Sequence, residues 1–128
     1  MIKSILICDS QGFPFYSKKL DFQMEEIEPA IFSGLISAIG AIGKQIFNED
    51  IATITYGSKY QIIIVTRNFL SNSKSIYFVF LVEGDIDIKL IKRISTHIFI
   101  ETKQVLKDRK AESFKIDEKI DTLLMKFF

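Results

Sequence analysis

Residues 34–46 read "GLISAIGAIGKQI", and the pair Gly43 and Lys44 is the first feature that suggests chemistry. In P-loop proteins a glycine-rich loop ending in Gly-Lys cradles phosphates, and a Ser or Thr after the lysine binds Mg²⁺. Here Ala38 stands at the first glycine position of that motif, and Gln45 replaces the hydroxyl. No strand precedes the segment, and its apolar residues recur with helical spacing. We therefore expect a helix here and no bound nucleotide.

Other candidates for catalysis or metal binding are few. Cys8 is the only cysteine and His97 the only histidine, so an internal disulfide and a multi-Cys zinc site are excluded. The apolar run "SILIC" predicts that Cys8 is buried, and His97 falls at the polar margin of a predicted helix. Asp85 and Asp87 flank a helix start, where capping accounts for them. We expect no catalytic residue, no metal and no cofactor, and hence a protein that is not an enzyme.

Composition narrows the class further. The chain has 128 residues, which predicts a single domain over residues 1–128, and 48% of them are hydrophobic, enough for a core. The net charge of +1 gives no reason to expect a nucleic-acid partner. No signal peptide is recognisable, and the charge-free run Pro29–Gly43 is shorter than the roughly 20 residues of a membrane span. We expect a cytoplasmic protein, with a peripheral position at membranes left open.

The hydrophobic pattern predicts eight elements in the order β-β-α-β-β-β-α-α. Strands are expected over Ile2–Cys8, Pro14–Leu20, Ile51–Tyr56, Tyr60–Thr66 and Ile76–Val82, and helices over Glu25–Phe47, Ile86–Lys107 and Phe114–Phe127. The first and last strands are continuous apolar runs, which is typical of strands that are covered on both faces. The second and third strands are more polar, so we expect them at the sheet edges.

The first helix is apolar on nearly every side, and a helix of that kind is normally buried all round. We assign the larger aliphatic arc to the core: Ile31, Leu35, Ile39, Ile42 and Ile46. A second side is then expected to face outward, with the residues Phe32, Ile36, Gly40, Gly43 and Phe47. Either the last helix or a loop covers that side, or another subunit does. We expect a subunit interface that also includes the neighbouring edge strand. The backbone hydrogen-bonding groups of that strand, which carries Thr53 and Thr55, are open for pairing with a partner.

The second long helix has one aliphatic face and one basic face. The basic face carries Lys89, Lys92, Arg93 and Lys103. Most such faces are simply solvated. Contact with acidic lipid or with an acidic partner is the alternative that we retain.

The opening stretch "MIKSILICDSQGFPFYSKKL" resembles the N-terminal hairpin of longin-domain proteins, especially that of sigma-type small subunits of vesicle-coat adaptors. The resemblance implies an α+β fold with a five-stranded antiparallel sheet of order 2-1-5-4-3, one helix on one face and two on the other. No SNARE helix follows, and the later residues differ from coat subunits. The chain therefore looks like a stand-alone longin, of the kind found in archaea and in trafficking complexes that regulate small GTPases. It is also similar to the related roadblock domain.

Three functions follow from these observations. The resemblance implies a non-catalytic interaction module, either a homodimer or a longin/roadblock-type heterodimer. It would act as a platform or regulator for a small Ras-like GTPase or a vesicle-trafficking partner. The second hypothesis is a small-ligand sensor, which an apolar cavity with converging polar groups would favour. The third is a membrane-surface adaptor that uses the basic helix.

Overall fold

The computed structural model describes residues 1–21, 28–69, 75–107 and 113–126. They fall into two compact units, Met1–Ile86 and Asp87–Phe128. The first unit contains one sheet and one helical segment: β1 (Ile2–Asp9), β2 (Pro14–Lys19), α1 (Pro29–Ile42), a π-helical turn η1 (Gly43–Phe47), β3 (Ile51–Tyr56), β4 (Tyr60–Asn68) and β5 (Ser75–Glu83). The second unit contains two helices, α2 (Ile88–Lys107) and α3 (Ser113–Leu124).

The sheet has five strands in the order β2-β1-β5-β4-β3. All four neighbouring pairs are antiparallel. The predicted strand order is therefore confirmed, including the more polar strands β2 and β3 at the two edges. The order was implied by the longin resemblance. The central and edge positions came from the rule that continuous apolar runs need cover on both faces, which is correct for β1 and β5.

Both faces of the central strands are buried. On one face, five strand residues pack with α1 around Ile36: Leu6, Cys8, Ile64, Tyr77 and Val79. The alternate positions of the same strands are equally inaccessible: Ile5, Ile7, Ile63, Val65, Phe78 and Phe80. Because side chains alternate between the faces of a strand, these two sets identify both faces as core.

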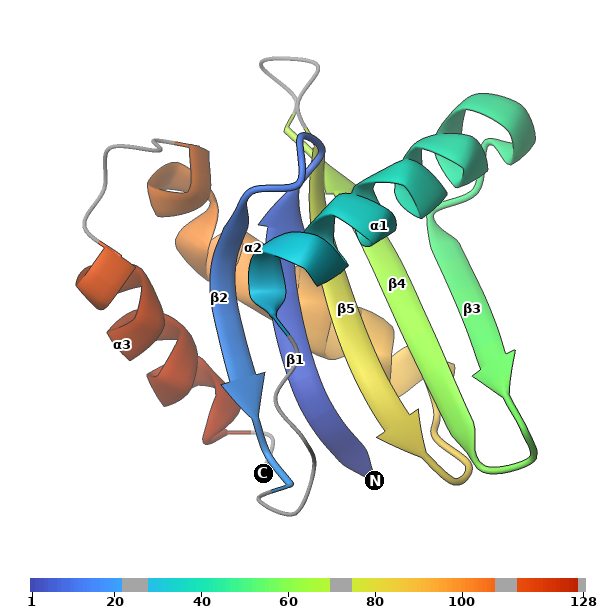
Figure 1. Ribbon diagram of the computed structural model, residues 1–128. Helices are drawn as coiled ribbons and strands as arrows, with labels where there is room; N and C mark the ends of the chain where they lie inside the picture. The colour runs from blue at the N-terminus through green and yellow to red at the C-terminus, as the bar shows by residue number, and fades with distance from the viewer. Residues whose placement is uncertain (22–27, 70–74, 108–112, 127–128) are drawn as a thin grey trace. The chain divides into compact units, whose positions relative to one another are not determined.

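Figure 1 shows α1 crossing one face of the sheet at an angle to the strands. The expected start of this helix at Glu25 lies outside the described residues, and the described helix begins at Pro29. Helical backbone then continues to Phe47 as predicted, but its last five residues form a π-helical turn. Asn48, in the left-handed conformation with φ 52°, ends it.

The second unit begins with a cap. Asp87 Oδ1 accepts a hydrogen bond of 2.9 Å from the backbone N–H of Lys89, so the predicted capping role of Asp87 is confirmed. In α2 the buried positions include Ile91, Ile94 and Ile98, which have the spacing of one helix face. The described α3 ends at Leu124 and residues 125 and 126 form a turn, so the predicted end at Phe127 was too late. The placement of α2 and α3 on the second face of the sheet, and the single-domain organisation, stay predictions.

Candidate interaction surfaces

The orientation of α1 is set by two serines and a turn. The carboxylate of Asp9 accepts the backbone N–H groups of Gln11 and Phe13, each at 2.9 Å, and shapes the turn between β1 and β2. Hydroxyls on α1 then donate to carbonyls of that turn: Ser33 Oγ to Gly12 and Ser37 Oγ to Ser10. These bonds satisfy backbone acceptors that α1 would otherwise cover without a partner. The serine side of α1 therefore faces the protein.

The same side of α1 brings the helix close to the sheet. Gly40 is buried, and a Cβ placed on it would lie 2.5 Å from Cζ of Tyr77. Ile36, one turn earlier, is completely inaccessible to solvent. Phe32 packs against the same cluster. Only a glycine at position 40 lets the backbone approach Tyr77 this closely.

This arrangement corrects the predicted helix phase. Phe32, Ile36 and Gly40 were expected to face outward as an interface, and they pack against the sheet of their own chain. Ile31 and Leu35 were expected in the core, and they are 77% and 56% exposed. The prediction assigned the core to the larger aliphatic arc. The physical reason for the reversal is that both serines have carbonyl acceptors inside the protein.

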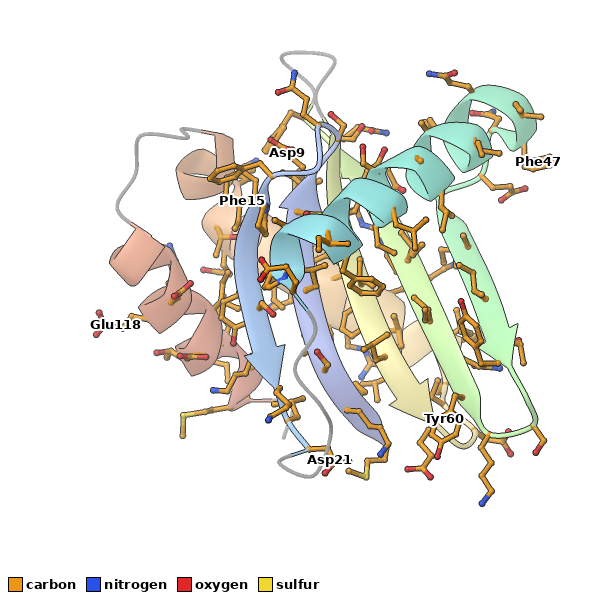
Figure 2. The ribbon with its side chains drawn as sticks, in the orientation of Figure 1. Asp9, Phe15, Asp21, Phe47, Tyr60 and Glu118 are labelled. Atoms are coloured by element: carbon orange, nitrogen blue, oxygen red, sulfur yellow. The ribbon has the colours of Figure 1, made fainter. Side chains whose placement is uncertain are left out.

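The outward side of the helical segment is consequently apolar. We call it the α1 stripe; its large members are Ile31, Leu35, Ile42, Ile46 and Phe47. All five are at least half exposed, from 51% for Ile42 to 77% for Ile31. Figure 2 shows Phe47 at the end of this segment, projecting away from the sheet. Phe47 is thus on the surface, while Gly43 is half-buried. The interface role predicted for both stays a prediction.

The edge strand β3 follows the stripe in sequence. It pairs with β4 along one side only, which leaves the hydrogen-bonding groups of its other side without a strand. Thr53 and Thr55 are both exposed on it. An unpaired edge of this kind is a template for pairing with another chain.

The helical segment also satisfies the length and composition of a membrane span. Pro29–Phe47 is 19 residues long, and it is the one such helix among the described residues. The core helix of a folded protein meets the same criteria. In this fold Ile36 and Gly40 pack on the sheet, and Ser33 and Ser37 bond to the turn.

A shallow hollow of about 380 Å³ lies on the part of the sheet beyond α1. Its lining includes the cross-strand partners Tyr56 and Tyr60, together with Lys3. Figure 2 shows Tyr60 at the end of the sheet that α1 does not cross. Nζ of Lys3 is already held by Asp21 at 2.7 Å and Glu83 at 3.2 Å. These hydrogen bonds raise the pKa of Lys3 above its ordinary value, so its charge is engaged within the fold.

Residues with reactive side chains do not converge. Gly43 and Lys44 lie in helical backbone as predicted, and Lys44 Nζ pairs with Asp50 at 2.9 Å. Burial, with a smaller effect of neighbouring Asp9, raises the pKa of the Cys8 thiol to about 12, which leaves it protonated and unreactive near neutrality. Within the described ranges, no three His, Cys, Asp or Glu side chains are grouped to hold a metal ion.

The basic residues of α2 share the helix face opposite its buried isoleucines. Lys89, Lys92, Arg93 and Lys103 are all exposed. Their predicted position on the solvent side of the helix is therefore confirmed. Their predicted contact with lipid or with an acidic partner stays a prediction.

No protein-family model matches the sequence, and no curated protein matches it. Solved structures do match the fold. Myxococcus xanthus MglB superimposes with a TM-score of 0.58 at 15% identity, covering 83% of this chain and 84% of that one. A Roadblock/LC7 domain from Streptomyces avermitilis gives 0.57 at 10% identity, covering 84% and 87%. The gliding protein MglB from Thermus thermophilus gives 0.51 at 11% identity, covering 64% of this chain and 61% of that one.

These similarities show that the chain has a longin/roadblock-like fold, as the hairpin resemblance implied. The sequence identities are too low to carry more than the fold. This chain covers only 61% of the length of the Thermus protein.

Proposed function

We propose that this chain is a non-catalytic interaction module that self-associates through the α1 stripe and β3, and that the dimer serves as a platform or regulator for a small Ras-like GTPase. The observation that carries the proposal is the α1 stripe itself. The large apolar side chains of the stripe are half or more exposed along the whole helical segment. A continuous exposed apolar patch of this kind marks an interaction site.

A second copy of the chain fits this surface best. A two-fold axis brings the same patch together from both subunits, so an apolar helix face packs on its own equivalent. The same axis can pair the open edge of β3 with the partner's β3. A lipid bilayer would cover the stripe but would leave the edge of β3 unpaired. One solved MglB structure with this fold has a tetrameric arrangement.

The GTPase part rests on the resemblance to longin and roadblock domains, whose members regulate small GTPases. A small-ligand sensor is less well supported, because the hollow beside Tyr60 is shallow and its one charged lining residue, Lys3, is already held by two carboxylates. A vesicle-trafficking partner would use the same dimer.

Self-association is tested with Leu35→Asp, and Ser17→Asp serves as the charge-matched control. Ser17 is exposed on β2, at the other edge of the sheet. Sedimentation equilibrium of the wild type should give a dimer. Leu35→Asp should give a folded monomer, because each buried unpaired carboxylate costs several kcal/mol, while Ser17→Asp should stay dimeric. A wild type that remains monomeric at high concentration would exclude the homodimer.

The partner is tested separately. Wild type and Leu35→Asp are used to capture proteins from the native lysate, and any GTPase recovered is purified. Its rates of GTP hydrolysis and nucleotide exchange are then measured with and without this chain. A change of at least several-fold that the wild type produces and Leu35→Asp does not would support the proposal. Unchanged rates with a bound GTPase, or no GTPase at all, would refute the GTPase role and leave the dimer standing.

A further inference from the structure

The exposed face of α2 combines cations with an apolar side chain. At 100° per residue, Lys89, Lys92, Arg93 and Lys103 lie within an arc of about 100° on the helix. Ile100 falls inside that arc and is 59% exposed. The buried residues Ile91, Ile94 and Ile98 lie on the opposite side. The exposed face of α2 therefore carries one apolar side chain within a cluster of four cations.

The charges on this face are unbalanced. Among the residues that the structure describes, none of the four cations forms an ion pair. The exposed acid nearest in sequence to Ile100, Glu101, falls outside the arc because successive residues are turned by 100°. The face therefore presents four positive charges over a helix length of about 21 Å, at 1.5 Å per residue between Lys89 and Lys103.

We propose that the exposed face of α2 docks on a membrane surface that contains anionic phospholipid. The four cations would lie at the level of the phosphate and carboxylate headgroups, and Ile100 would enter the boundary with the acyl chains. A cluster of Lys and Arg near an anionic membrane surface is attracted to it by about 1 kcal/mol per cation. The inference is independent of the proposed dimer, which uses α1 and β3.

A bilayer fits this face better than an acidic protein does. Three of the four cations are lysines, whose ammonium groups act as point charges and do not require a fixed partner geometry. Recognition of a particular carboxylate favours the bidentate geometry of arginine instead. Ile100 adds an apolar contact, which a bilayer supplies directly beneath its anionic headgroups and a nucleic-acid backbone does not.

Binding to vesicles tests the proposal with two double variants of equal charge. Lys92→Gln/Arg93→Gln removes two charges from the face, and Lys59→Gln/Lys126→Gln removes two exposed charges elsewhere. Vesicles of phosphatidylcholine with about 30% phosphatidylserine should bind the wild type, and each charge lost from the face should weaken binding about five-fold. The first double variant should therefore bind at least ten-fold more weakly than the second. Melting temperatures should match.

Insertion of the apolar residue has its own readout. The chain contains no tryptophan, so Ile100→Trp introduces the only one. Its emission should shift to shorter wavelength with anionic vesicles and be quenched by brominated acyl chains. Raising the salt from about 0.1 M to about 1 M should release the protein, because the Debye length falls from about 10 Å to about 3 Å.

Several outcomes would overturn the proposal. They are failure to bind anionic vesicles, equal loss in the two double variants, or no quenching of the introduced tryptophan when the Ile100→Trp protein is bound. Equal binding to vesicles of phosphatidylcholine alone would assign the contact to the apolar α1 stripe, and Leu35→Asp would then abolish it. Binding of duplex DNA with the affinity shown for anionic vesicles, lost in the first double variant, would assign the face to nucleic acid.

Discussion

The two long helices show opposite relations between sequence pattern and orientation. In α2 the polar face is marked by charges, and the buried isoleucines lie on the opposite, aliphatic face as predicted. In α1 the only polar residues are two serines, and the aliphatic side chains are distributed all round the helix. The pattern predicted the correct phase for α2 and the wrong one for α1. Burying a lysine costs a large desolvation free energy, whereas a serine can be buried wherever a carbonyl accepts a hydrogen bond from its hydroxyl.

The difference between the helices also separates the roles that we propose for them. The outer face of α1 is apolar and adjoins an open strand edge, so it suits a protein surface of the same kind. The outer face of α2 is cationic and suits an anionic surface. Each of the following predictions tests whether α1 and α2 differ in this way, and they run from the largest expected effect to the smallest.

Ile36→Asp should abolish folding. Ile36 is inaccessible to solvent and packs among Leu6, Cys8 and Tyr77, so Asp would have to bury a carboxylate without a partner. The cost of several kcal/mol, added to the lost packing, is comparable with the about 5–15 kcal/mol that stabilise a typical domain. Circular dichroism during urea titration should show no cooperative transition.

The neighbouring substitution Leu35→Asp is the matched control, because the residue is exposed and carries the same change. The urea unfolding transitions of Leu35→Asp and of the wild type, both extrapolated to low protein concentration, should lie close together. The phase deduced from sequence alone gives the reverse order, with Ile36→Asp folded and Ile31→Asp unfolded. A folded Ile36→Asp protein would therefore restore that phase and disprove the packing of α1 described above.

These residues show what could be predicted from the sequence. The element order, the strand order and the edge positions of β2 and β3 followed from local apolar runs and the hairpin resemblance. The π-helical turn Gly43–Phe47 did not, because no residue in it signals that change of backbone. The orientation of α1 depends on the carbonyls of Ser10 and Gly12, which are distant in sequence. The serine pair at a spacing of four residues, in line with Gly40, was the one available signal.

The core beneath α1 should also make the protein sensitive to alkali. Burial raises the pKa of Cys8 from 9.0 to about 12 and raises that of Tyr77 as well. The folded state then holds these protons more tightly than the unfolded state does. Stability is therefore complete below about pH 9 and falls above it, by up to about 1.4 kcal/mol per pH unit for Cys8.

Urea unfolding at about pH 8 and about pH 10.5 measures this loss. Cys8→Ala should be less stable at the lower pH, because it leaves a small cavity, but should lose less stability on going to the higher one. An unchanged pH dependence in Cys8→Ala would show that the thiol does not titrate with folding. The same substitution should leave the association state unaffected, since Cys8 of β1 is buried beneath α1 and away from the α1 stripe.

Two glycines of α1 provide a smaller and more local test. A Cβ at Gly40 would lie 2.5 Å from Cζ of Tyr77, whereas one at Gly34 meets nothing within 4 Å. Gly40→Ala should lose about 1–3 kcal/mol to overpacking, partly offset by the helix preference of alanine. Gly34→Ala should gain up to about 1 kcal/mol from that preference alone. Equal effects in denaturant titrations would mean that α1 does not approach the sheet closely at Gly40.

The smallest effect on stability is expected on α2. Replacing Lys89, Lys92, Arg93 and Lys103 together with Gln should leave the melting temperature nearly unchanged. These side chains are exposed and form no ion pair among the described residues, and exposed charges contribute about 0–1 kcal/mol each even when they are paired. Removing four like charges also relieves their mutual repulsion along the helix. Differential scanning calorimetry measures the change. A fall of more than about 8 °C corresponds to roughly 2 kcal/mol or more for a domain of this size. Such a fall would show that this face packs against protein. The polar side of α2 would then be buried, as that of α1 is.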